Sequence, residues 1–428
     1  MDSPSTDTLL ITSLDNAASA RHAGRTDGRT NRKEELLSKQ ESMIAVIPIA
    51  LVSSIAAVMW IHPRLVKIAL MKNIVDNPNA RKLQRYPVPV LGGVAVFFGI
   101  ALGACIACSY AGCLSPLSLV AAMVIMLYTG TMDDILDLEP WLRLAIEVGV
   151  VLLLIFSSHT TINSLHSLWG VERIASVVAI PLTVVAAVGI INAINLVDGV
   201  NGLSSTLVIM ASAAFGLLFY RVGDMPMLIL ATVTIGALLP FLFHNLFGGA
   251  SKMFIGDGGT MVMGVVMASF VVNTLGYESH IVQGIGPSFG VVAFVLAVVA
   301  IPVFDTLRVM AGRLLRGTSP LRADRTHLHH LFLEMGYSHS GTTLAIVALN
   351  IVVVAAQWLA WQLGASIEVQ LYIVVAMGIV ATIGVSLVAG ADEENSIKRA
   401  ARAIGRATHF EAKGGFRRLQ RLADRMQI

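Results

Sequence analysis

Long apolar stretches recur along the chain from residue 44 to residue 390, and short polar segments separate them. Each stretch is close to the ~20 residues that a helix needs to cross a hydrocarbon core of ~30 Å. A transmembrane β-barrel would instead show short strands of alternating polarity, and the sequence contains no such series. The pattern therefore predicts an all-α polytopic membrane protein with about 11 transmembrane helices. The expected spans are residues 44–62, 90–110, 115–131, 142–158, 175–195, 204–221, 226–247, 259–276, 287–307, 342–362 and 369–390.

The composition excludes several classes of soluble protein. Of the 428 residues, 55% are hydrophobic and 13% are charged, whereas soluble domains carry about 25% charged residues. A soluble protein with so few charges would expose large apolar patches and aggregate. A cytosolic globular enzyme, a disordered scaffold and a disulfide-stapled secreted module are therefore all excluded.

The net charge is +3, and the distribution of basic residues predicts the orientation in the membrane. Together with Arg143, the segments on one side hold 22 of the 30 lysines and arginines, whereas the loops on the other side hold only Arg173 and Arg221. The N-terminal tail, which precedes the first span on that other side, holds the remaining six and is the exception to the pattern. The positive-inside rule places the richer side in the cytoplasm. The cytoplasmic segments are then residues 62–89, 130–141, 196–203, 248–258, 308–341 and 391–428.

The two ends of the chain differ from the predicted transmembrane domain, residues 43–392. Residues 1–42 are polar and have no apolar core of a signal peptide, so they are expected to be a disordered extension or a start-site artefact with translation from Met43. Residues 393–428 space apolar side chains among nine lysines and arginines. Because this segment adjoins a span, we expect a basic amphipathic helix on membrane lipids and no nucleic-acid binding.

Acidic residues lie where the predicted spans meet the cytoplasm. A carboxylate near the membrane costs ~2.5–3.5 kcal/mol on insertion scales, so this placement needs a reason. The spans alternate in direction, yet every acidic motif falls on the same side, which allows them to share one site. The residues are Asp133, Asp134 and Asp137 in GTMDDILDLEP, Asp198 in NAINLVDGVNGL, Asp257 in MFIGDGGT, and Asp305 at the inner end of the ninth span.

Each acidic motif has a chemical interpretation and a simpler alternative. Aspartates one helical turn apart suit Mg²⁺, although a solvated acidic loop looks the same. Asn192 and Asn195 project amides near one face, to cap a turn or to bind a ligand. Asp257 lies between glycines just before a helix N-terminus, where anions are favoured.

Basic and imidazole side chains gather in two cytoplasmic loops. The segment SPLRADRTHLHHLFLEMG could bind zinc, but donors to phosphate or sugar oxygens fit better because cysteine is absent and carboxylates abound. Its candidates are Arg322, Arg325, His327, His329 and His330, and those of the first loop are Asp76, Asn79, Arg81 and Lys82. Carboxylates, basic groups and a membrane mouth together indicate phosphoryl transfer to a lipid. No Walker-type loop is present, which disfavours nucleotide-triphosphate hydrolysis.

The ordered motifs DNPNARK, GTMDDILD, NAINLVDGVNGL, MFIGDGGT and RxxRTHLHHL resemble those of the polyprenyl-phosphate N-acetylhexosamine-1-phosphate transferases of glycosyltransferase family 4. The resemblance covers about residues 43–392. It implies transfer of a sugar-1-phosphate from a UDP-sugar donor to undecaprenyl phosphate, with release of UMP. It further implies Mg²⁺, with Mn²⁺ as a substitute, cytoplasmic catalytic loops, a bacterial plasma membrane and a possible homodimer.

Within that family, the HLHHL segment is similar to the WecA-like branch, which uses UDP-GlcNAc and related donors at the start of cell-surface polysaccharide pathways such as O-antigen. The MraY relatives, which use UDP-MurNAc-pentapeptide, typically carry consecutive histidines there. A donor of that kind is the alternative within the family. An ion-coupled secondary transporter is the alternative from another class, although the acids lie at one face and no repeat is visible.

The resemblance also assigns roles by position. Asp257 matches the principal Mg²⁺ ligand, and Asp133 and Asp134 match an acidic pair that serves as base, nucleophile or metal support. Asp198 and Asn195 match nucleotide and metal-site positions, and Phe254 matches an aromatic residue that stacks on uracil. The expected catalytic residues are Asp133, Asp134, Asp198 and Asp257, with Asp133, Asp134 and Asp257 at the metal. The expected substrate-binding residues are Asp76, Asn79, Arg81, Lys82, Asp137, Asn192, Asn195, Asn201, Phe254, Arg322, Arg325, His327, His329 and His330.

Two positions depart from the family pattern. Many relatives have aspartate where this chain has Asn201, so a carboxylate contact to the nucleoside is not assumed. The glycine motif ends in Thr260 in place of the commoner serine, which keeps the hydroxyl group.

Overall fold

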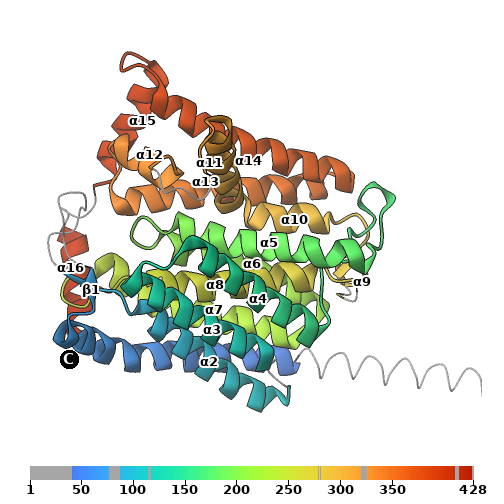
Figure 1. Ribbon diagram of the computed structural model, residues 1–428, viewed down its shortest axis with the longest axis horizontal. Coiled ribbons are helices and arrows are strands. Elements are labelled where there is room, and N and C mark those ends of the chain that lie inside the picture. The colour runs from blue at the N-terminus through green and yellow to red at the C-terminus, as the bar shows by residue number, and fades with distance from the viewer. Residues whose placement is uncertain are drawn as a thin grey trace, which may run out of the picture.

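The computed structural model describes residues 41–76, 87–113, 117–277, 279, 281–319, 325–409 and 414–426. Long helices lie side by side along one direction, which confirms the predicted all-α polytopic fold (Figure 1). The polar segment 1–40 lies outside the described residues. The long helices are Glu41–Lys72, α2 Gly92–Ala111, α3 Leu117–Leu136, α4 Pro140–Ser158, α5 Ser176–Val197, α6 Leu203–Val222, α7 Met225–Phe247, α8 Gly256–Thr274, α11 Ala300–Leu315, α13 His339–Gln362 and α14 Ile367–Gly390. The shorter elements are β1 Val75–Asp76, β2 Val88–Pro89, η1 Leu168–Gly170, α9 Ile281–Ile285, α10 Val291–Val298, α12 Leu328–Glu334, α15 Ser396–Ala407 and α16 Gly414–Arg425.

Within the described residues, nine helices are long and apolar enough to cross a membrane, and the pair α10–α11 would make a tenth. The predicted eighth span does form a helix, α8, but it is not among the nine because Asp257, several glycines and Asn273 dilute its apolar character. α8 packs against α2, α3 and α5 at the centre of the bundle. Other helices cover it, so it does not need the apolar surface that lipid demands.

The predicted ninth span is broken in two. α10 and α11 meet at Val299 with a bend of 74°, and Figure 1 shows α11 crossing the other long helices steeply. Pro302 lacks an N–H and its ring crowds the carbonyl four residues earlier, and a proline at such a position bends or breaks a helix. The Asn350 side chain satisfies the freed backbone: its Nδ2 donates to the Val298 carbonyl at 3.0 Å, and its Oδ1 accepts from the Ile301 N–H at 2.9 Å.

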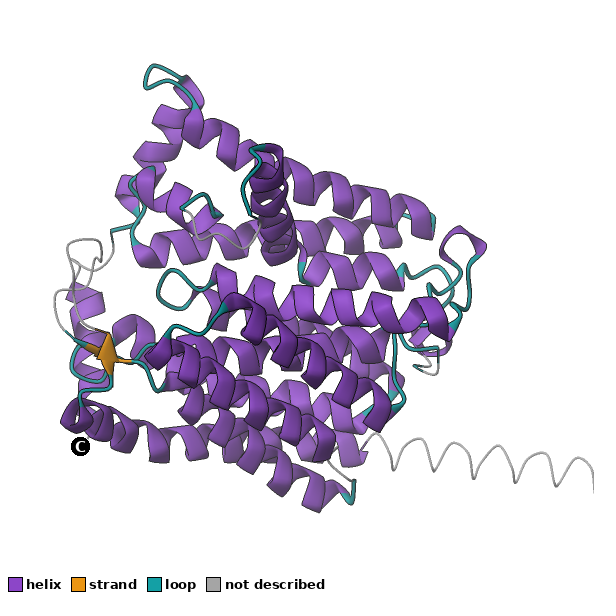
Figure 2. Cartoon of the chain, in the orientation of Figure 1, coloured by secondary structure: helices purple, strands orange, loops and turns teal. Residues whose placement is uncertain are grey.

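The first helix is longer than the sequence pattern predicted. It continues from the expected boundary at residue 62 to Lys72, through Arg64 and Lys67. The prediction stopped where charged residues interrupt the apolar pattern. The helix itself continues, because beyond the hydrocarbon layer it can carry charged side chains. The hairpin β1–β2 follows, with Asp76 paired to Val88, at the left end of the bundle in Figure 2.

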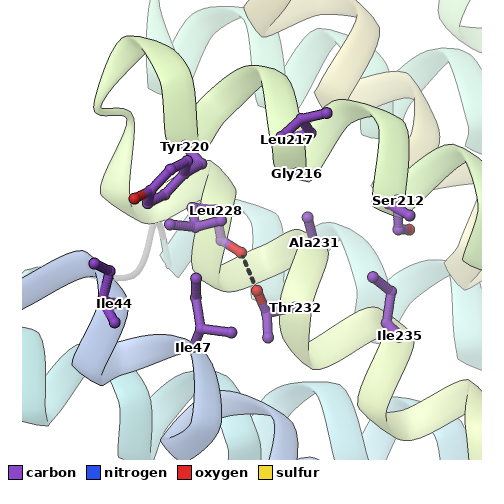
Figure 3. Close-up of a pocket in the computed structure, with 11 residues that line it drawn as sticks. Ile44, Ile47, Ser212, Gly216, Leu217, Tyr220, Leu228, Ala231, Thr232 and Ile235 are labelled. Atoms are coloured by element: carbon purple, nitrogen blue, oxygen red, sulfur yellow. Dashed lines mark hydrogen bonds between the residues drawn. The ribbon is translucent and has the colours of Figure 1, made fainter. Parts of the chain in front are cut away.

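One apolar cavity lies away from the acidic motifs. It has a volume of about 320 Å³ and lies between the first helix, α6 and α7 (Figure 3). Ile44 and Ile47 face Tyr220 and Leu228 across it, near the helix ends opposite those that carry the aspartates. Among the residues that the structure describes, no charged side chain lines this cavity. The chemistry must therefore be sought at the other end of the bundle.

Candidate active site

Four helix ends meet at one end of the bundle, and we call this the site end. α3 and α5 finish there, and α4 and α8 begin there. α3 continues through Asp133 and Asp134, and then Asp137 adopts a left-handed conformation with φ of 49°. The Asp133 carboxylate accepts from the Leu138 N–H at 2.9 Å, and Pro140 begins α4. This tight turn sends α4 back beside α3 and leaves Asp137 exposed.

Glycines bring α3 and α8 into direct backbone contact at the site end. A Cβ at Gly130 on α3 would lie 2.4 Å from the Gly258 nitrogen and from the Asp257 carbonyl carbon. Gly256 has φ of +67°, and a Cβ there would lie 2.6 Å from the Asp134 carboxylate. The Asp257 N–H donates to Asp134 Oδ2 at 2.9 Å. Asp134 therefore places a carboxyl oxygen at the N-terminus of α8, where the helix dipole favours an acceptor.

Arg143, on the first turns of α4, is the centre of the acidic cluster. Its Nη1 donates to Asp133 Oδ2 at 2.9 Å and lies 3.7 Å from Asp257 Oδ2. Its Nη2 donates to the side-chain oxygens of Asn192 at 3.1 Å and Asn195 at 3.3 Å. One guanidinium thus joins α3, α4, α5 and α8, and it holds the carboxylates of Asp133 and Asp257 close together. The sequence had marked Arg143 only as a charge at a helix mouth.

A buried carboxylate supports Arg143 from behind. Glu147 Oε1 lies 3.4 Å from Arg143 Nε, one helical turn along α4, and the Glu147 side chain is only 1% exposed. Asn192 Nδ2 donates to the other Glu147 oxygen, and Asn195 Nδ2 donates to Thr260 Oγ1 at 2.8 Å. The expectation that the two amides share one face is confirmed, and in this structure they bind side chains. Sequence reasoning missed Glu147. A glutamate that is followed by the apolar run VGVVLLL and lies four residues after an arginine could have indicated a buried ion pair.

Asp198 lies beside this cluster, directly after α5. Its Oδ1 accepts from Ser204 Oγ at 2.5 Å. Burial raises the pKa of Asp198 to about 7; the Ser204 hydroxyl opposes the rise and the charge of Asp257 adds to it. A carboxyl group with a pKa near 7 can gain or lose a proton under ordinary conditions, which is a common feature of functional sites. The next residue, Gly199, lies against His329: a Cβ there would be 2.0 Å from His329 Nε2.

The histidine segment forms a second polar cluster beside the first. His327 Nδ1 lies 3.0 Å from Asp305 Oδ2, and Arg308 Nη2 donates to Asp305 Oδ1 at 2.7 Å. The His327 and His329 rings are stacked with centroids 6.0 Å apart, and His330 lies 4.2 Å from His329. His327 Nε2 has no hydrogen-bond partner among the described residues, although His327 is buried. Asp305 therefore fixes the orientation of His327, a role the sequence did not assign to it, and Arg308 was missed.

Comparison with known proteins identifies the family. The sequence profile of Glycosyl transferase family 4 matches residues 116–275. An undecaprenyl-phosphate alpha-N-acetylglucosaminyl 1-phosphate transferase from Haemophilus influenzae is 32% identical over 287 residues, which are 65% of this chain and 77% of that protein. The chain belongs to glycosyl transferase family 4. Proteins of the same name from Escherichia coli O157:H7 and Salmonella typhi are 29% and 28% identical over 276 and 275 residues, or 64% of this chain and 72% of each relative.

The match to glycosyl transferase family 4 covers the acidic cluster. Residues 116–275 extend from the start of α3 to just beyond α8, so they contain every side chain bound by Arg143. The histidine cluster lies outside the matched residues. This chain is thus a multi-pass membrane transferase of the family, and the recognised region coincides with the part of its structure where the carboxylates meet.

Where the structure describes them, the remaining predicted site residues of this family 4 protein do not contact Arg143 or belong to the His327 cluster. Phe254 is half-buried, its N–H donates to the Pro89 carbonyl at 2.8 Å, and Lys252 Nζ lies 5.7 Å from its ring centroid. The Asn201 N–H donates to His339 Nδ1 at 3.4 Å, and Asp76 lies on β1. Arg325 is exposed beside the histidine segment. Asn79, Arg81, Lys82 and Arg322 lie outside the described residues, and their roles stay predictions.

The donor set of the acidic cluster fits a hard divalent cation. Asp133 and Asp257 approach the same guanidinium nitrogen, and the Asp257 side chain is 37% exposed to solvent. Within the described part of the chain, no three histidine, cysteine, aspartate or glutamate side chains form a ready metal cage. Mg²⁺ is usually held by one or two carboxylates together with substrate phosphates, which agrees with this arrangement. Asp134 is turned onto the backbone of α8, so its role as a ligand stays a prediction.

The buried pair Arg143–Glu147 gives a stability prediction. Arg143→Gln leaves the Glu147 carboxylate buried without its cation, and breaking such a pair costs about 3 kcal/mol. We expect the single variant to show a clearly lower Tm in detergent, measured by intrinsic fluorescence. The double variant Arg143→Gln/Glu147→Gln removes both charges and should recover most of that loss. If the double variant is as unstable as the single one, the unpaired charge of Glu147 is not the cause of the lost stability.

His329 gives a prediction for pH. Burial lowers the pKa of His329 to about 3, and the neighbouring His330 and His327 add to this effect. Because the unfolded imidazole binds a proton below about pH 6.5 and the folded one does not, stability falls as the pH is lowered from about 6.5 towards 3. Between pH 7.5 and 5.5 this contributes a loss of about 1 kcal/mol. His329→Gln should lose correspondingly less stability over the same range, measured as the change in Tm; equal losses would contradict a neutral buried His329.

Proposed function

We propose that this protein transfers GlcNAc-1-phosphate from UDP-GlcNAc to undecaprenyl phosphate and releases UMP. The observation that carries the proposal is the meeting of Asp133, Asp257 and Arg143 at one end of a bundle of membrane helices. The names of the relatives support both the sugar and the lipid acceptor. A site at the helix ends lets a water-soluble nucleotide sugar meet a phosphate whose lipid tail stays in the membrane.

The reaction exchanges one phosphorus–oxygen bond for another. An oxygen of the lipid phosphate forms a bond to the β-phosphorus of the UDP-sugar, and the bond from that phosphorus to the oxygen of UMP breaks. The lipid phosphate has a second pKa of ~6 and is largely ionised at pH 7, so a strong base is not needed. The principal obstacle is repulsion between two anions.

The residues of the cluster reduce that repulsion. We propose that Asp133 and Asp257, supported by Asp134, hold Mg²⁺ or Mn²⁺, which when bound would supply positive charge to the phosphates. Arg143 keeps the two carboxylates together and is itself a cation at the same place. Asp198, with its raised pKa, can take up or release a proton beside the phosphates. Asn195 is oriented by Arg143 and Thr260 towards the same space.

The histidine cluster supplies a donor on the other side of Asp198. With Nδ1 directed to the Asp305 carboxylate, His327 presents its unpartnered Nε2 for a ligand. A protonated imidazole so oriented donates a charge-assisted hydrogen bond to a phosphate oxygen. We propose that His327 contacts the pyrophosphate of the donor, with Asp305 and Arg308 as positioning residues.

A donor screen tests the proposal. Purified protein in detergent with Mg²⁺ and undecaprenyl phosphate is offered UDP-GlcNAc, UDP-GalNAc or UDP-MurNAc-pentapeptide, and UMP is measured. We expect UMP from UDP-GlcNAc, and its loss on addition of EDTA followed by recovery with excess Mg²⁺. Release of UMP from a different donor alone would correct the sugar and keep the reaction, whereas no UMP from any donor with folded protein would contradict the reaction itself.

The orientation in the cell follows from the same proposal. The site end carries the basic segments, so we place it and the C-terminus in the cytoplasm of a bacterial cell, where UDP-sugars are made. Ion-coupled transport is disfavoured because the acidic cluster lies at the helix ends and not at the middle of the spans.

A further inference from the structure

The C-terminal helices bind both sides of the site end. The carboxylate of Asp424 on α16 accepts from the N–H groups of Gly249 and Ser251, each at 3.0 Å. Phe416 packs on Phe247 with ring centroids 5.3 Å apart. The inner face of α16 is therefore attached to the connection from α7 to α8, a few residues before Asp257.

α15 holds a different connection in a similar way. Ser338 Oγ donates to the Thr408 carbonyl at 2.7 Å, and Gly405 lies against the ring of Tyr337. His409 Nε2 is 3.2 Å from the Gly336 carbonyl. These contacts fix the turn between α12, which carries the histidines, and α13. Figure 1 shows α15 and α16 on the same end of the molecule, one above the other.

Each helix also has two outer faces that nothing in the described structure covers. Ile397 and Ile404, seven residues apart on α15, are exposed, and so are Leu419 and Leu422 on α16. An exposed basic stripe runs beside the apolar stripe on α16, and on α15 it lies on the opposite side of the helix from the apolar stripe. The basic residues are Arg399 and Arg406 on α15, and Arg417, Arg418, Arg421 and Arg425 on α16. An apolar stripe and a separate basic stripe on one exposed helix are typical of helices that lie in a membrane surface.

Both helices lie at the level where spans end. α14 ends at Gly390 and α15 begins at Ser396, so the five intervening residues reach at most about 18 Å. α16 packs on Phe247, the last residue of the span α7. Lipid headgroups lie at the level where membrane spans end, which is where both helices are held. A partner in free solution would not need the helices to lie so close to the membrane.

We propose that α15 and α16 form a strap that binds anionic lipid headgroups through its outer faces while its inner faces hold the α7–α8 and α12–α13 connections. The arginines meet the negative headgroups, and the apolar stripes enter the boundary of the acyl chains. Lipid composition is thereby linked to the two segments that carry Asp257 and the histidines. The proposal does not depend on which reaction the site performs.

The test measures hydrogen exchange of the full chain in nanodiscs. Nanodiscs of phosphatidylcholine alone are compared with nanodiscs that contain about one third phosphatidylglycerol. We expect the amides of α15 and α16 to exchange at least about tenfold more slowly with the anionic lipid, because each arginine near such a surface favours binding about fivefold. High salt should remove the difference. Equal exchange in both lipids would overturn the proposal and leave the outer faces to a protein partner.

Matched variants separate charge from structure. Arg417→Gln/Arg418→Gln/Arg421→Gln should abolish the response of α16 to anionic lipid, whereas the three corresponding changes to lysine keep the charge and should preserve it. Asp424→Ala leaves the outer faces unchanged; it should speed exchange at Gly249 and Ser251 in both lipids. If the glutamine and lysine variants respond equally to anionic lipid, attraction between the arginines and the headgroups does not cause the slower exchange of α16. If Asp424→Ala leaves Gly249 and Ser251 protected, α16 does not hold that connection.

Discussion

Asp257→Asn is expected to lower the rate of UMP release by at least about a thousandfold while the protein stays folded. The Asp257 carboxylate is 37% exposed and lies 3.7 Å from Arg143 Nη1 and next to Asp133. Asparagine keeps the shape of the side chain but removes the negative charge that would bind a divalent cation. Loss of that cation removes several kcal/mol of charge stabilisation from the reacting phosphates. The measurement is UMP release by purified protein at saturating donor and Mg²⁺.

A matched aspartate serves as the control for Asp257→Asn. Asp224 begins α7 at the opposite end of the bundle, and its side chain accepts from the Met227 N–H at 3.1 Å. Asparagine caps helices as well as aspartate does, so Asp224→Asn should change neither the Tm nor the activity. Activity of Asp257→Asn within tenfold of the parent would contradict the assignment of Asp257 to the reacting phosphates.

The second large effect is expected from Gly130→Ala. The new Cβ would lie 2.4 Å from backbone atoms of Asp257 and Gly258, so α3 and α8 must separate. Overpacking of this kind costs about 1–3 kcal/mol, and a displacement of about 1 Å at a site lowers the rate by about a hundredfold. We therefore expect a lower Tm together with a rate lowered by about a hundredfold in the UMP assay.

Gly149→Ala is the matched control for Gly130→Ala. Gly149 also lies within a membrane helix, α4, but apart from its chain neighbours and the nearby backbone of α4, no heavy atom of the described residues lies within 4 Å of its Cβ position. The same change should therefore leave the rate unaltered and leave the Tm unchanged or slightly raised, because alanine favours a helix over glycine. Similar losses for both variants would show that the close crossing of α3 and α8 does not position Asp257.

The sequence predicted that the acidic motifs share one site, and the prediction has one physical reason. Burying a carboxylate near lipid is costly, so acids confined to one side of an alternating series of spans indicate a shared site. The structure places Asp133, Asp198 and Asp257 together at the site end, as expected. The helix break just before Pro302 follows from an equally local rule, which concerns only the proline and the residues just before it.

The sequence could not reveal the contacts that organise the site. Arg143 and Asn192 are 49 residues apart in the chain, and His327 meets an aspartate 22 residues earlier. Such pairs depend on how the helices pack, and no local pattern encodes them. The burial of Glu147 could not be predicted for the same reason, because an acidic residue flanked by apolar ones does not reveal which helix its side chain faces. The docking of α16 through Asp424 likewise appears only once the helices are placed.

The most direct test of the account follows the β-phosphate of the donor. UDP-GlcNAc labelled with ³²P at the β-phosphate is incubated with the purified protein, Mg²⁺ and undecaprenyl phosphate, and the label in the lipid phase is compared with the UMP released. Transfer of a sugar-1-phosphate predicts equal amounts of lipid-bound label and UMP, and loss of both in Asp257→Asn. Label that stays in the water phase as UDP while the sugar enters the lipid would contradict the account, because the bond broken would then be the one to the sugar carbon.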